Sequence, residues 1–378
     1  MTSHPSLNSP EILTPAFLVD PVIVRQNCDA MREKARRSGV VFRPHVKTHK
    51  TVEAARLQVG DAGGPITVST LAEAEFFADH GFDDITYAVP IAPAKLAKAA
   101  ALARRIKRLN LLLDSFEALR AIEEFHTTHG TVFHVFLKVD CGYHRAGVDP
   151  DSHEGQKLGL ALANSPAVHF EGLLTHAGHS YNARNSEEIL KAAADESSSV
   201  TRFADFLRAH GAKQLARSIG STPTASLVER FTDADEVRPG CYVFYDVFQA
   251  RIGSCSLSQV AVSVLATVIG SYPERGKLLL DAGALALSKD LGPDHLDPDC
   301  GFGVVCDLEL RPLPMKLKVL SQEHGKTEAA PEVVARFPVG SRVRIVPNHV
   351  CLTAAMYDAY HVVSADGVSG QWKPVRGW

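Results

Sequence analysis

The sequence predicts a (β/α)8 barrel of the TIM type, followed by a β-rich C-terminal domain. From residue 17 to about residue 222, short apolar runs alternate with longer amphipathic helical patterns. The spacing is about 25–30 residues per strand-helix unit, as in a closed eight-stranded barrel. After Pro239-Gly240 the long helical patterns stop, and short β-type runs separated by Gly, Pro and Asp turns follow. This change of character predicts a second domain.

Many of the expected barrel strands are continuous apolar runs, such as Leu109–Leu113, which suits parallel strands buried on both faces. An open doubly wound sheet is the alternative fold. That fold usually has a Gly-rich phosphate turn after its first strand, and the sequence has none there. The eight expected strands are Phe17–Asp20, Val40–Val46, Pro65–Thr70, Ile85–Pro90, Leu109–Asp114, Val132–Asp140, Val168–His176 and Leu215–Thr222.

The expected boundary places the barrel at residues 17–255 and the β-rich domain at 256–378. Because catalytic side chains of such barrels cluster at the C-terminal ends of the strands, the polar residues there are the first candidates for function. The expected strands of the second domain are Val260–Ile269, Lys277–Asp281, Cys306–Leu310, Met315–Leu320, Ser341–Val346 and Tyr360–Val363.

The composition is that of a soluble enzyme and points away from nucleic acid and membranes. The 40 basic residues nearly balance the 43 acidic ones, so the chain has no excess of positive charge that would attract a polyanion. Seven scattered cysteines do not form the pattern of a disulfide framework. Neither a signal peptide nor a run of roughly 18 apolar residues is found. We therefore expect a cytoplasmic protein.

The segment Arg43–Lys50 places several polar side chains at the end of the second expected strand. On an extended chain His45 and Lys47 point to the same side, toward the barrel mouth. Desolvation and neighbouring cations can lower the pKa of a lysine there and make it nucleophilic. A basic strand edge with solvated lysines is the non-functional alternative.

His349 and Cys351 follow the apolar strand ending at Val346 and are two residues apart. On an extended chain both side chains would face the same way. Imidazole and thiolate are the donors that zinc prefers, and a two-residue set leaves positions open for water or substrate. A chance pairing of the two residue types is the alternative, and the pair alone is weak evidence of a metal site.

Two glycine-containing segments, Ser218–Thr222 and Arg238–Tyr242, combine backbone N–H groups, hydroxyls and flexible glycines. These are the parts of a phosphate-binding nest. An ordinary strand-to-helix turn and an ordinary turn into a strand are the alternatives.

Taken together, these segments resemble the D-serine dehydratase / D-threonine aldolase family of fold-type III pyridoxal-phosphate enzymes, relatives of alanine racemase. The resemblance covers essentially the whole chain and is closest to the metal-dependent D-serine dehydratases. It implies a pyridoxal-phosphate-binding barrel, a β domain that also takes in residues 1–16, and a head-to-tail homodimer. Its markers are Leu13–Ala16, Arg43–Lys50, Ser69–Ala74, Asp140–Gly147, Ser218–Pro223, Arg238–Asp246, Gln322–Gly325, His349–Cys351 and Pro374–Trp378.

The resemblance also implies roles for single residues. Lys47 would carry pyridoxal 5'-phosphate as a Schiff base, Arg145 would approach the cofactor ring, and Tyr181 would lie near it. His349 and Cys351 would hold a divalent metal, zinc first, with manganese, magnesium or cobalt as alternatives. The phosphate contacts would be Ser221, Thr222, Gly240 and Tyr242.

The implied reaction is β-elimination from a D-3-hydroxy amino acid, such as D-serine giving pyruvate and ammonia. D-Threonine and D-threo-3-hydroxyaspartate are further candidate substrates. In the family, His-x-Cys is typical of the dehydratases and His-Cys-Asp of the aldolases. A D-threonine aldolase, with His45 or His179 as the base, is the alternative enzyme. A cofactor-binding homeostasis protein is the non-enzymatic alternative.

Overall fold

A computed structural model describes residues 5–61 and 63–378, and the chain forms two compact units. The barrel unit comprises Asp29–Gly240 with the last residues, Val375–Trp378. The β unit comprises the chain up to Cys28 together with Cys241–Pro374. The helix α1 (Pro21–Ser38) begins in the β unit and ends in the barrel unit. Among the described residues, no helix is both long enough and apolar enough to cross a membrane.

The barrel unit is a ring of eight parallel strands in the order β2-β9-β8-β7-β6-β5-β4-β3. A bridge between His45 and Thr67 joins the chain after β2 to β3 and closes the ring. Leu112, Phe136 and Leu174 pack together within it, as expected for strands buried on both faces. The strands are β2 (Val41–Phe42), β3 (Ile66–Val68), β4 (Asp84–Pro90), β5 (Arg108–Leu113), β6 (Phe133–Lys138), β7 (Val168–Leu174), β8 (Ala216–Ile219) and β9 (Glu236–Val237).

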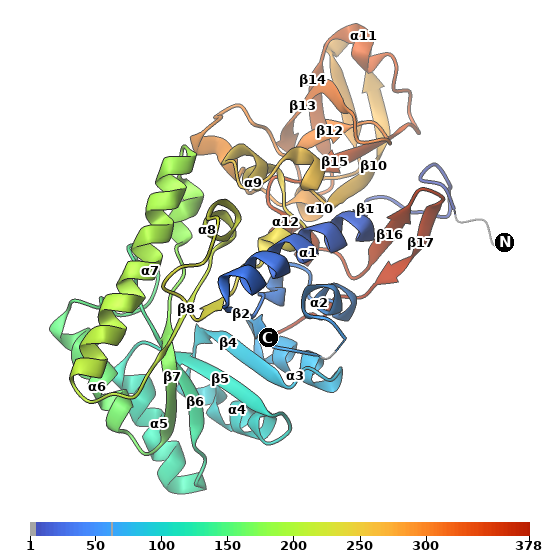
Figure 1. Ribbon diagram of the computed structural model, residues 1–378. Coiled ribbons are helices and arrows are strands. Elements are labelled where there is room, and N and C mark those ends of the chain that lie inside the picture. Colours follow the sequence, from blue (N-terminus) through green and yellow to red (C-terminus); the bar gives the residue numbers. More distant parts are fainter. Residues whose placement is uncertain (1–4, 62) are drawn as a thin grey trace. The chain divides into compact units, whose positions relative to one another are not determined.

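Helices connect these strands and lie outside the ring (Figure 1). Most of them begin at a Ser, Thr or Asn whose side chain accepts a hydrogen bond from a backbone N–H of the first turn, which fixes where the helix starts. The capping residues are Thr51, Thr70, Ser115, Ser152, Asn185 and Ser221. The helices are α2 (Val52–Val59), α3 (Leu71–Asp79), α4 (Leu96–Ala103), α5 (Phe116–His129), α6 (His153–Asn164), α7 (Ser186–Ala209) and α8 (Thr222–Leu227).

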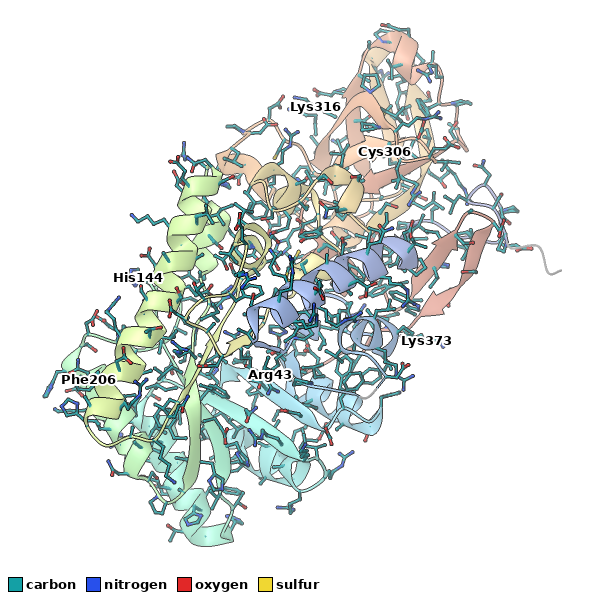
Figure 2. All side chains as sticks on the ribbon, viewed as in Figure 1. Arg43, His144, Phe206, Cys306, Lys316 and Lys373 are labelled. Carbon is teal, nitrogen blue, oxygen red and sulfur yellow. The ribbon has the colours of Figure 1, made fainter. Side chains whose placement is uncertain are left out.

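A buried ion-pair cluster ties the closing strands of the barrel together. The guanidinium of Arg43 (labelled in Figure 2) lies 2.5 Å from Oε2 of Glu236 and 2.6 Å from Oδ1 of Asp84. Arg43 and Glu236 are almost fully buried. Bidentate guanidinium–carboxylate pairs are among the strongest hydrogen-bonded interactions in proteins, so this cluster fixes β2 against β9 and β4.

The β unit contains a nine-stranded sheet in the order β11-β14-β13-β12-β15-β10-β1-β16-β17. Because β11 also pairs with β10, six of these strands close into a barrel. The strands are β1 (Ala16–Val19), β10 (Val262–Tyr272), β11 (Lys277–Leu280), β12 (Val304–Cys306), β13 (Pro312–Leu320), β14 (Gly325–Ala329), β15 (Arg342–Val346), β16 (Tyr360–Ser364) and β17 (Gly367–Trp372).

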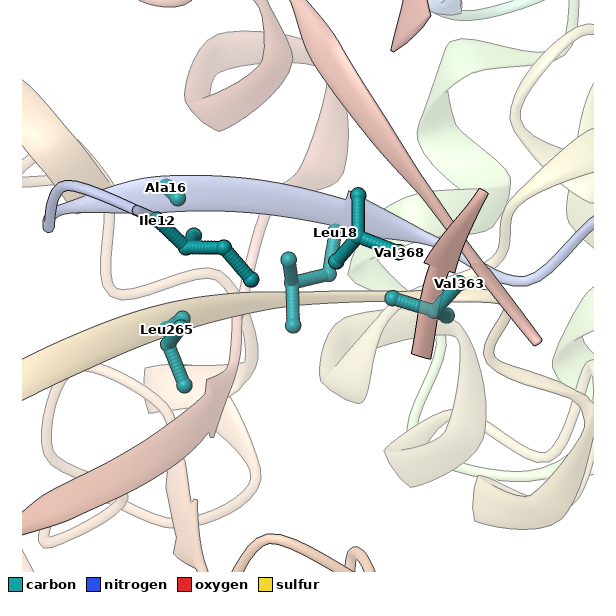
Figure 3. Packing of buried hydrophobic residues seen from close by; sticks show 6 residues of the cluster. All are labelled: Ile12, Ala16, Leu18, Leu265, Val363 and Val368. Atoms are coloured by element: carbon teal, nitrogen blue, oxygen red, sulfur yellow. The ribbon is translucent and has the colours of Figure 1, made fainter. Parts of the chain in front are cut away.

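Residues from both ends of the chain share the core of the β unit. Ile12, Ala16 and Leu18 pack against Leu265 of β10, and Val363 and Val368 complete the cluster (Figure 3). The short helices of this unit are α9 (Val247–Arg251), α10 (Ala284–Leu287), α11 (Pro331–Val334) and α12 (Val350–Ala355).

The fold class is the predicted one, but two strands differ from the expectation for the barrel, and β14 and β17 of the β unit were not expected. The run Phe17–Asp20, expected as the first barrel strand, instead lies in β1 and pairs with β10 and β16 of the nine-stranded sheet. An apolar run buried on both faces looks the same in either sheet, so its sequence could not distinguish them. The remaining barrel strand is β9, whose two residues are too short to give a periodic pattern. The compact units accordingly divide between Gly240 and Cys241, whereas the sequence placed the boundary near residue 255.

Candidate active site

Lys47 lies in a tight turn just beyond the end of a barrel strand. The expected extended geometry, with His45 and Lys47 on one face, is wrong because Val46–Thr48 forms a turn of 3-10 helix. His45 precedes this turn in an extended conformation, and its Nδ1 lies 3.4 Å from the backbone N of Lys47. Nε2 of His45 lies 3.4 Å from the hydroxyl of Ser69. The backbone turn therefore presents Lys47 at the carboxyl end of β2, where barrel enzymes place their chemistry.

Two histidines, the buried His45 and the half-buried His176, are held in the neutral form beside several cations. Burial, reinforced by the charge of Lys47, lowers the pKa of each imidazole well below its usual value. Arg238 adds to the effect on His45, and Lys138 and Arg145 add to the effect on His176. The carboxyl end of the barrel thus gathers positive charge around neutral imidazoles.

Two of these cations are themselves deeply buried. Burial and the neighbouring Arg238 lower the pKa of Lys138 to about 8. Burial also lowers the pKa of Arg238 to about 10. Nε of Arg238 donates to the hydroxyl of Ser218 over 2.6 Å, and its Nη2 donates to the carbonyl oxygen of Thr175. Glu236 and Glu196 offset part of the buried positive charge of Arg238, and an anionic ligand would offset more of it.

The segment after β7 carries His176, His179 and Tyr181. Nδ1 of His176 lies 3.1 Å from the carbonyl oxygen of Gly220, and the His176 ring centroid lies 6.4 Å from that of Tyr181. Both ring nitrogens of His179 are buried, and neither has a hydrogen-bond partner among the described residues. An imidazole without a partner is unusual in a folded interior and suits a group that meets a ligand.

The segment after β8 carries Ser221 and Thr222. Ser221 caps α8, and its hydroxyl lies 2.9 Å from that of Ser180 and 2.9 Å from that of Thr224. Thr222 is the first residue of α8 and is buried. Gly220 has a φ of +129°, and a Cβ there would lie 2.7 Å from the backbone N of Arg238. Only glycine allows the two loops to approach this closely.

Gly240 and Arg145 are the other sequence candidates of the barrel unit. A Cβ on Gly240 would come within 3.1 Å of the Cβ of His45, so the glycine keeps space beside that imidazole. Arg145 is exposed, and its guanidinium carbon lies 5.2 Å from the ring centroid of Tyr143. The loop that carries Arg145 is fixed by Asp140, whose Oδ1 accepts N–H bonds from the backbones of residues 142–144. The charges of Lys47 and Arg145 both lower the pKa of His176, so both side chains lie near that imidazole.

In the β unit, His349 and Cys351 flank the start of a short helix. The expected extended chain is wrong here too, because α12 begins at Val350, with His349 as its N-cap and Cys351 in its first turn. The side chains of His349 and Cys351 nevertheless lie within hydrogen-bonding reach of each other. Nδ1 of His349 lies 2.6 Å from Oδ2 of Asp290. Burial opposes protonation of His349, but Asp290 and Cys351 outweigh it and raise its pKa to about 11.

The start of α12 is held by Asp246, a buried carboxylate of the same unit. Its Oδ2 accepts the backbone N–H of Val350 over 3.0 Å, and its Oδ1 accepts that of Gln249 over 2.8 Å. Burial raises the pKa of Asp246 to about 6. Cys241 lies beside Cys351, and its Sγ is 3.5 Å from Oδ2 of Asp246. Tyr242, the remaining sequence candidate, is fully buried in the turn Cys241–Val243.

These donor sets fit the two groups that the resemblance implies. A carboxylate on the outer nitrogen of a histidine is the usual support of a metal-bound imidazole, and Asp290 supplies it to His349. In the part of the chain that the structure describes, no three His, Cys, Asp or Glu side chains converge as a metal site. In the barrel unit, the cations and the unpartnered His179 fit an anionic aromatic cofactor.

The sequence analysis did not single out four charged residues near the candidate side chains: Lys138, Arg238, Asp290 and Glu196, whose Oε1 accepts the backbone N–H groups of Ala177 and Gly220. Lys138 ends an apolar strand, and a lone charge in such a run was a usable signal. Arg238 belongs to the segment Arg238–Tyr242, in which only Gly240 and Tyr242 were expected to contact the phosphate. Glu196 lies in the middle of a long helix and Asp290 in a loop, 59 residues from His349. For these two the sequence gives no local signal.

Two domain families match the chain. "Alanine racemase, N-terminal domain" matches residues 19–247, and "Putative serine dehydratase domain" matches residues 261–363. D-threo-3-hydroxyaspartate dehydratase of Delftia sp. (strain HT23) is 40% identical over 97% of this chain and 98% of the relative. D-serine dehydratase of Dictyostelium discoideum is 39% identical over 97% of both chains. D-threonine aldolase of Arthrobacter sp. is more distant, at 28% identity over 95% of this chain and 91% of the relative.

The solved structure of the Delftia dehydratase superposes with a TM-score of 0.93 over 99% of this chain and all of that one. The same protein has been solved with a cysteine changed to alanine, in the metal-free form, and with a histidine two positions earlier changed to alanine. This chain therefore belongs to the family of pyridoxal-phosphate-dependent lyases that contains the D-serine and D-threo-3-hydroxyaspartate dehydratases and, more distantly, the D-threonine aldolases.

Proposed function

We propose that this protein is a lyase that uses pyridoxal 5'-phosphate and a divalent metal to eliminate the β-hydroxyl of D-3-hydroxy amino acids. D-Serine would give pyruvate and ammonia, and D-threonine and D-threo-3-hydroxyaspartate are further substrates. The observation that carries the proposal is the His349–Cys351 pair, in which Nδ1 of His349 contacts Asp290. In the barrel unit, Lys47 lies near neutral histidines. The two relatives of about 40% identity are both named dehydratases, which supports elimination over aldol cleavage.

In the barrel unit, Lys47 would hold the cofactor covalently through Nζ. Ser221, Thr222, Gly240 and Tyr242 would bind its phosphate, Arg145 would approach its ring, and Tyr181 would lie nearby. When bound, the cofactor supplies an electron sink for the negative charge that develops at the substrate Cα.

Lys47 itself would transfer the proton of the substrate Cα. Nζ of Lys47 would be the group that removes this proton. His45 and His176 are neutral at physiological pH, because burial and the neighbouring cations lower their pKa values. A neutral imidazole can accept a hydrogen bond at its unprotonated nitrogen without adding to the positive charge. His179, with both nitrogens unpartnered among the described residues, would bind a polar substrate group.

In the β unit, His349 and Cys351 would hold the metal, with zinc preferred because the donors are nitrogen and sulfur. Hydroxide is a poor leaving group, and the metal supplies a Lewis acid for the departing charge. Asp290 would fix the ring of His349 so that Nε2 faces the metal. D-threo-3-hydroxyaspartate dehydratase has been solved with a histidine and a cysteine of this same two-residue spacing each changed to alanine, the cysteine variant in a metal-free form.

Two substitutions test the two halves of the proposal separately. Lys47→Ala should abolish the visible absorbance of bound cofactor, whereas Lys50→Gln, three residues away, should retain it. Cys351→Ala should keep that absorbance but lose the metal and lower the elimination rate by roughly 100-fold or more. Cys300→Ala is the matched control for thiol loss. Retention of the absorbance in Lys47→Ala would overturn the cofactor assignment, and full elimination activity in metal-free Cys351→Ala would overturn the metal role.

The resemblance also supports a cytoplasmic homodimer with a head-to-tail arrangement. Light scattering of the purified protein should give about twice the 40.8 kDa mass of the chain. A monomeric mass at working concentration in the active preparation would contradict the dimer.

A further inference from the structure

Glu196 is a buried carboxylate in the middle of α7 that the proposed chemistry does not use. Its Oε1 accepts the backbone N–H of Ala177 over 2.9 Å and that of Gly220 over 3.0 Å. Its Oε2 accepts the hydroxyl of Thr224 over 3.1 Å. Ala177 follows β7, whereas Gly220 and Thr224 follow β8. A single side chain therefore joins two separate loops at the carboxyl end of the barrel.

The hydrogen bonds of Glu196 continue directly to Ser221. The hydroxyl of Thr224 lies 2.9 Å from that of Ser221, and the backbone N of Ser221 lies 3.3 Å from the Thr224 hydroxyl. On the other loop, Ser180 donates to the carbonyl oxygen of Ala177 over 2.6 Å and lies 2.9 Å from the Ser221 hydroxyl. The network closes around Ser221, which the proposed function assigns to the cofactor phosphate.

Placing a carboxylate here is costly, because Glu196 is only 1% exposed. A buried charge is tolerated when hydrogen bonds and opposite charges compensate it. The three donors satisfy its oxygens, and its field reaches the buried cations Lys138 and Arg238. A neutral side chain would avoid the desolvation cost but could not hold two N–H groups and a hydroxyl with the strength of a charged acceptor.

We propose that Glu196 is a positioning residue that sets the loops after β7 and β8 in the geometry that binds the cofactor phosphate. This inference rests on the proposed function. The rigid element is α7, whose 24 residues anchor the carboxylate, and the loops are fixed to it. Loss of Glu196 would leave two backbone N–H groups without their acceptor and release Ser221 from its place. The effect should fall on the phosphate end of the cofactor and not on Lys47.

The test compares pyridoxal 5'-phosphate with pyridoxal, which lacks the phosphate but can form the same covalent link. Holoenzyme is stripped with hydroxylamine and reconstituted, and each dissociation constant is measured from the visible absorbance. Glu196→Ala should weaken pyridoxal phosphate by about 10–100-fold and pyridoxal by less than about 3-fold. Glu196→Gln should recover part of the wild-type ratio, since its Oε1 can accept both N–H groups and its Nε2 can donate to Thr224, although a neutral acceptor binds more weakly than a carboxylate.

Two further variants keep the test decisive. Glu187→Ala, on an exposed position of the same helix, should leave both constants unchanged. Thr224→Val should lower the phosphate selectivity by a smaller factor, which matters if Glu196→Ala fails to fold. Equal weakening of both ligands in Glu196→Ala, or an unchanged ratio in Thr224→Val, would overturn the positioning role. If the wild-type protein bound neither pyridoxal 5'-phosphate nor pyridoxal, the proposed function would be refuted, and this inference would be refuted with it.

Discussion

Oδ2 of Asp290 lies 2.6 Å from Nδ1 of His349, although 59 residues separate them in the chain. Because Asp290 occupies Nδ1, the other ring nitrogen of His349 is directed to the side of Cys351. In the proposed metal site, Asp290 would therefore fix the orientation of His349 without itself binding the metal.

Asp290→Ala should lower the affinity of the protein for zinc by about 10–100-fold, since the His349 ring loses its orienting carboxylate. The measurement is a competition titration with a chromogenic chelator. Asp294→Asn, in the same loop but exposed, is the control and should bind zinc as the wild type does. An unchanged affinity in Asp290→Ala would show that Asp290 does not support the metal site.

Arg43→Met should destabilise the barrel by about 3–5 kcal/mol, because it leaves the buried carboxylate of Glu236 without its cation. Urea unfolding would measure the change. Adding Glu236→Gln to Arg43→Met should recover part of the loss, since the unpaired charge is then removed. Arg36→Met breaks only an exposed pair with Glu33 and should barely move the unfolding midpoint. Equal midpoints for Arg43→Met and the wild type would refute the structural role of the cluster.

Lys138 should make the stability of the cofactor-free protein depend on pH. Its folded-state pKa of about 8 lies below that of an unfolded lysine, so between these values the unfolded chain binds more protons. Stability should therefore rise with pH from about 8 to about 10.5, by on the order of 3 kcal/mol. Below pH 8 the buried charge destabilises the fold in full.

Lys138→Met should remove this rise and stabilise the cofactor-free protein at pH 7. Thermal unfolding across the pH range would measure it, with the exposed Lys191→Met as the control that keeps the wild-type profile. A profile for Lys138→Met with the same upward slope would mean that another group titrates.

The fold class could be predicted from the sequence because buried parallel strands appear in it as apolar runs such as Leu109–Leu113. It misassigned Phe17–Asp20, since the run is equally apolar in the sheet where it actually lies. It also missed β9, whose two residues hold their place through partners on β2 and β8 and not through a pattern of their own.

Some residues of the candidate site could likewise be predicted from the sequence, and others could not. Lys47, His349 and Cys351 stood in local motifs, so the sequence could name them, although it expected strands where the structure has turns. Asp290 and Glu196 act through contacts across 59 and about 20 residues. Side chains of that kind are brought to the site by the fold alone, and no spacing rule applied to one sequence would single them out.

The measurement that tests the central claim most directly is product analysis of the metal-replete protein with D-threonine, with D-serine as the control. The 2-oxo acid, ammonia, glycine and acetaldehyde are quantified in the same sample. β-Elimination would give 2-oxobutanoate with equimolar ammonia from D-threonine, and pyruvate with ammonia from D-serine. Glycine with acetaldehyde would contradict it, because the chain would then cleave the Cα–Cβ bond as an aldolase despite its His349–Cys351 pair.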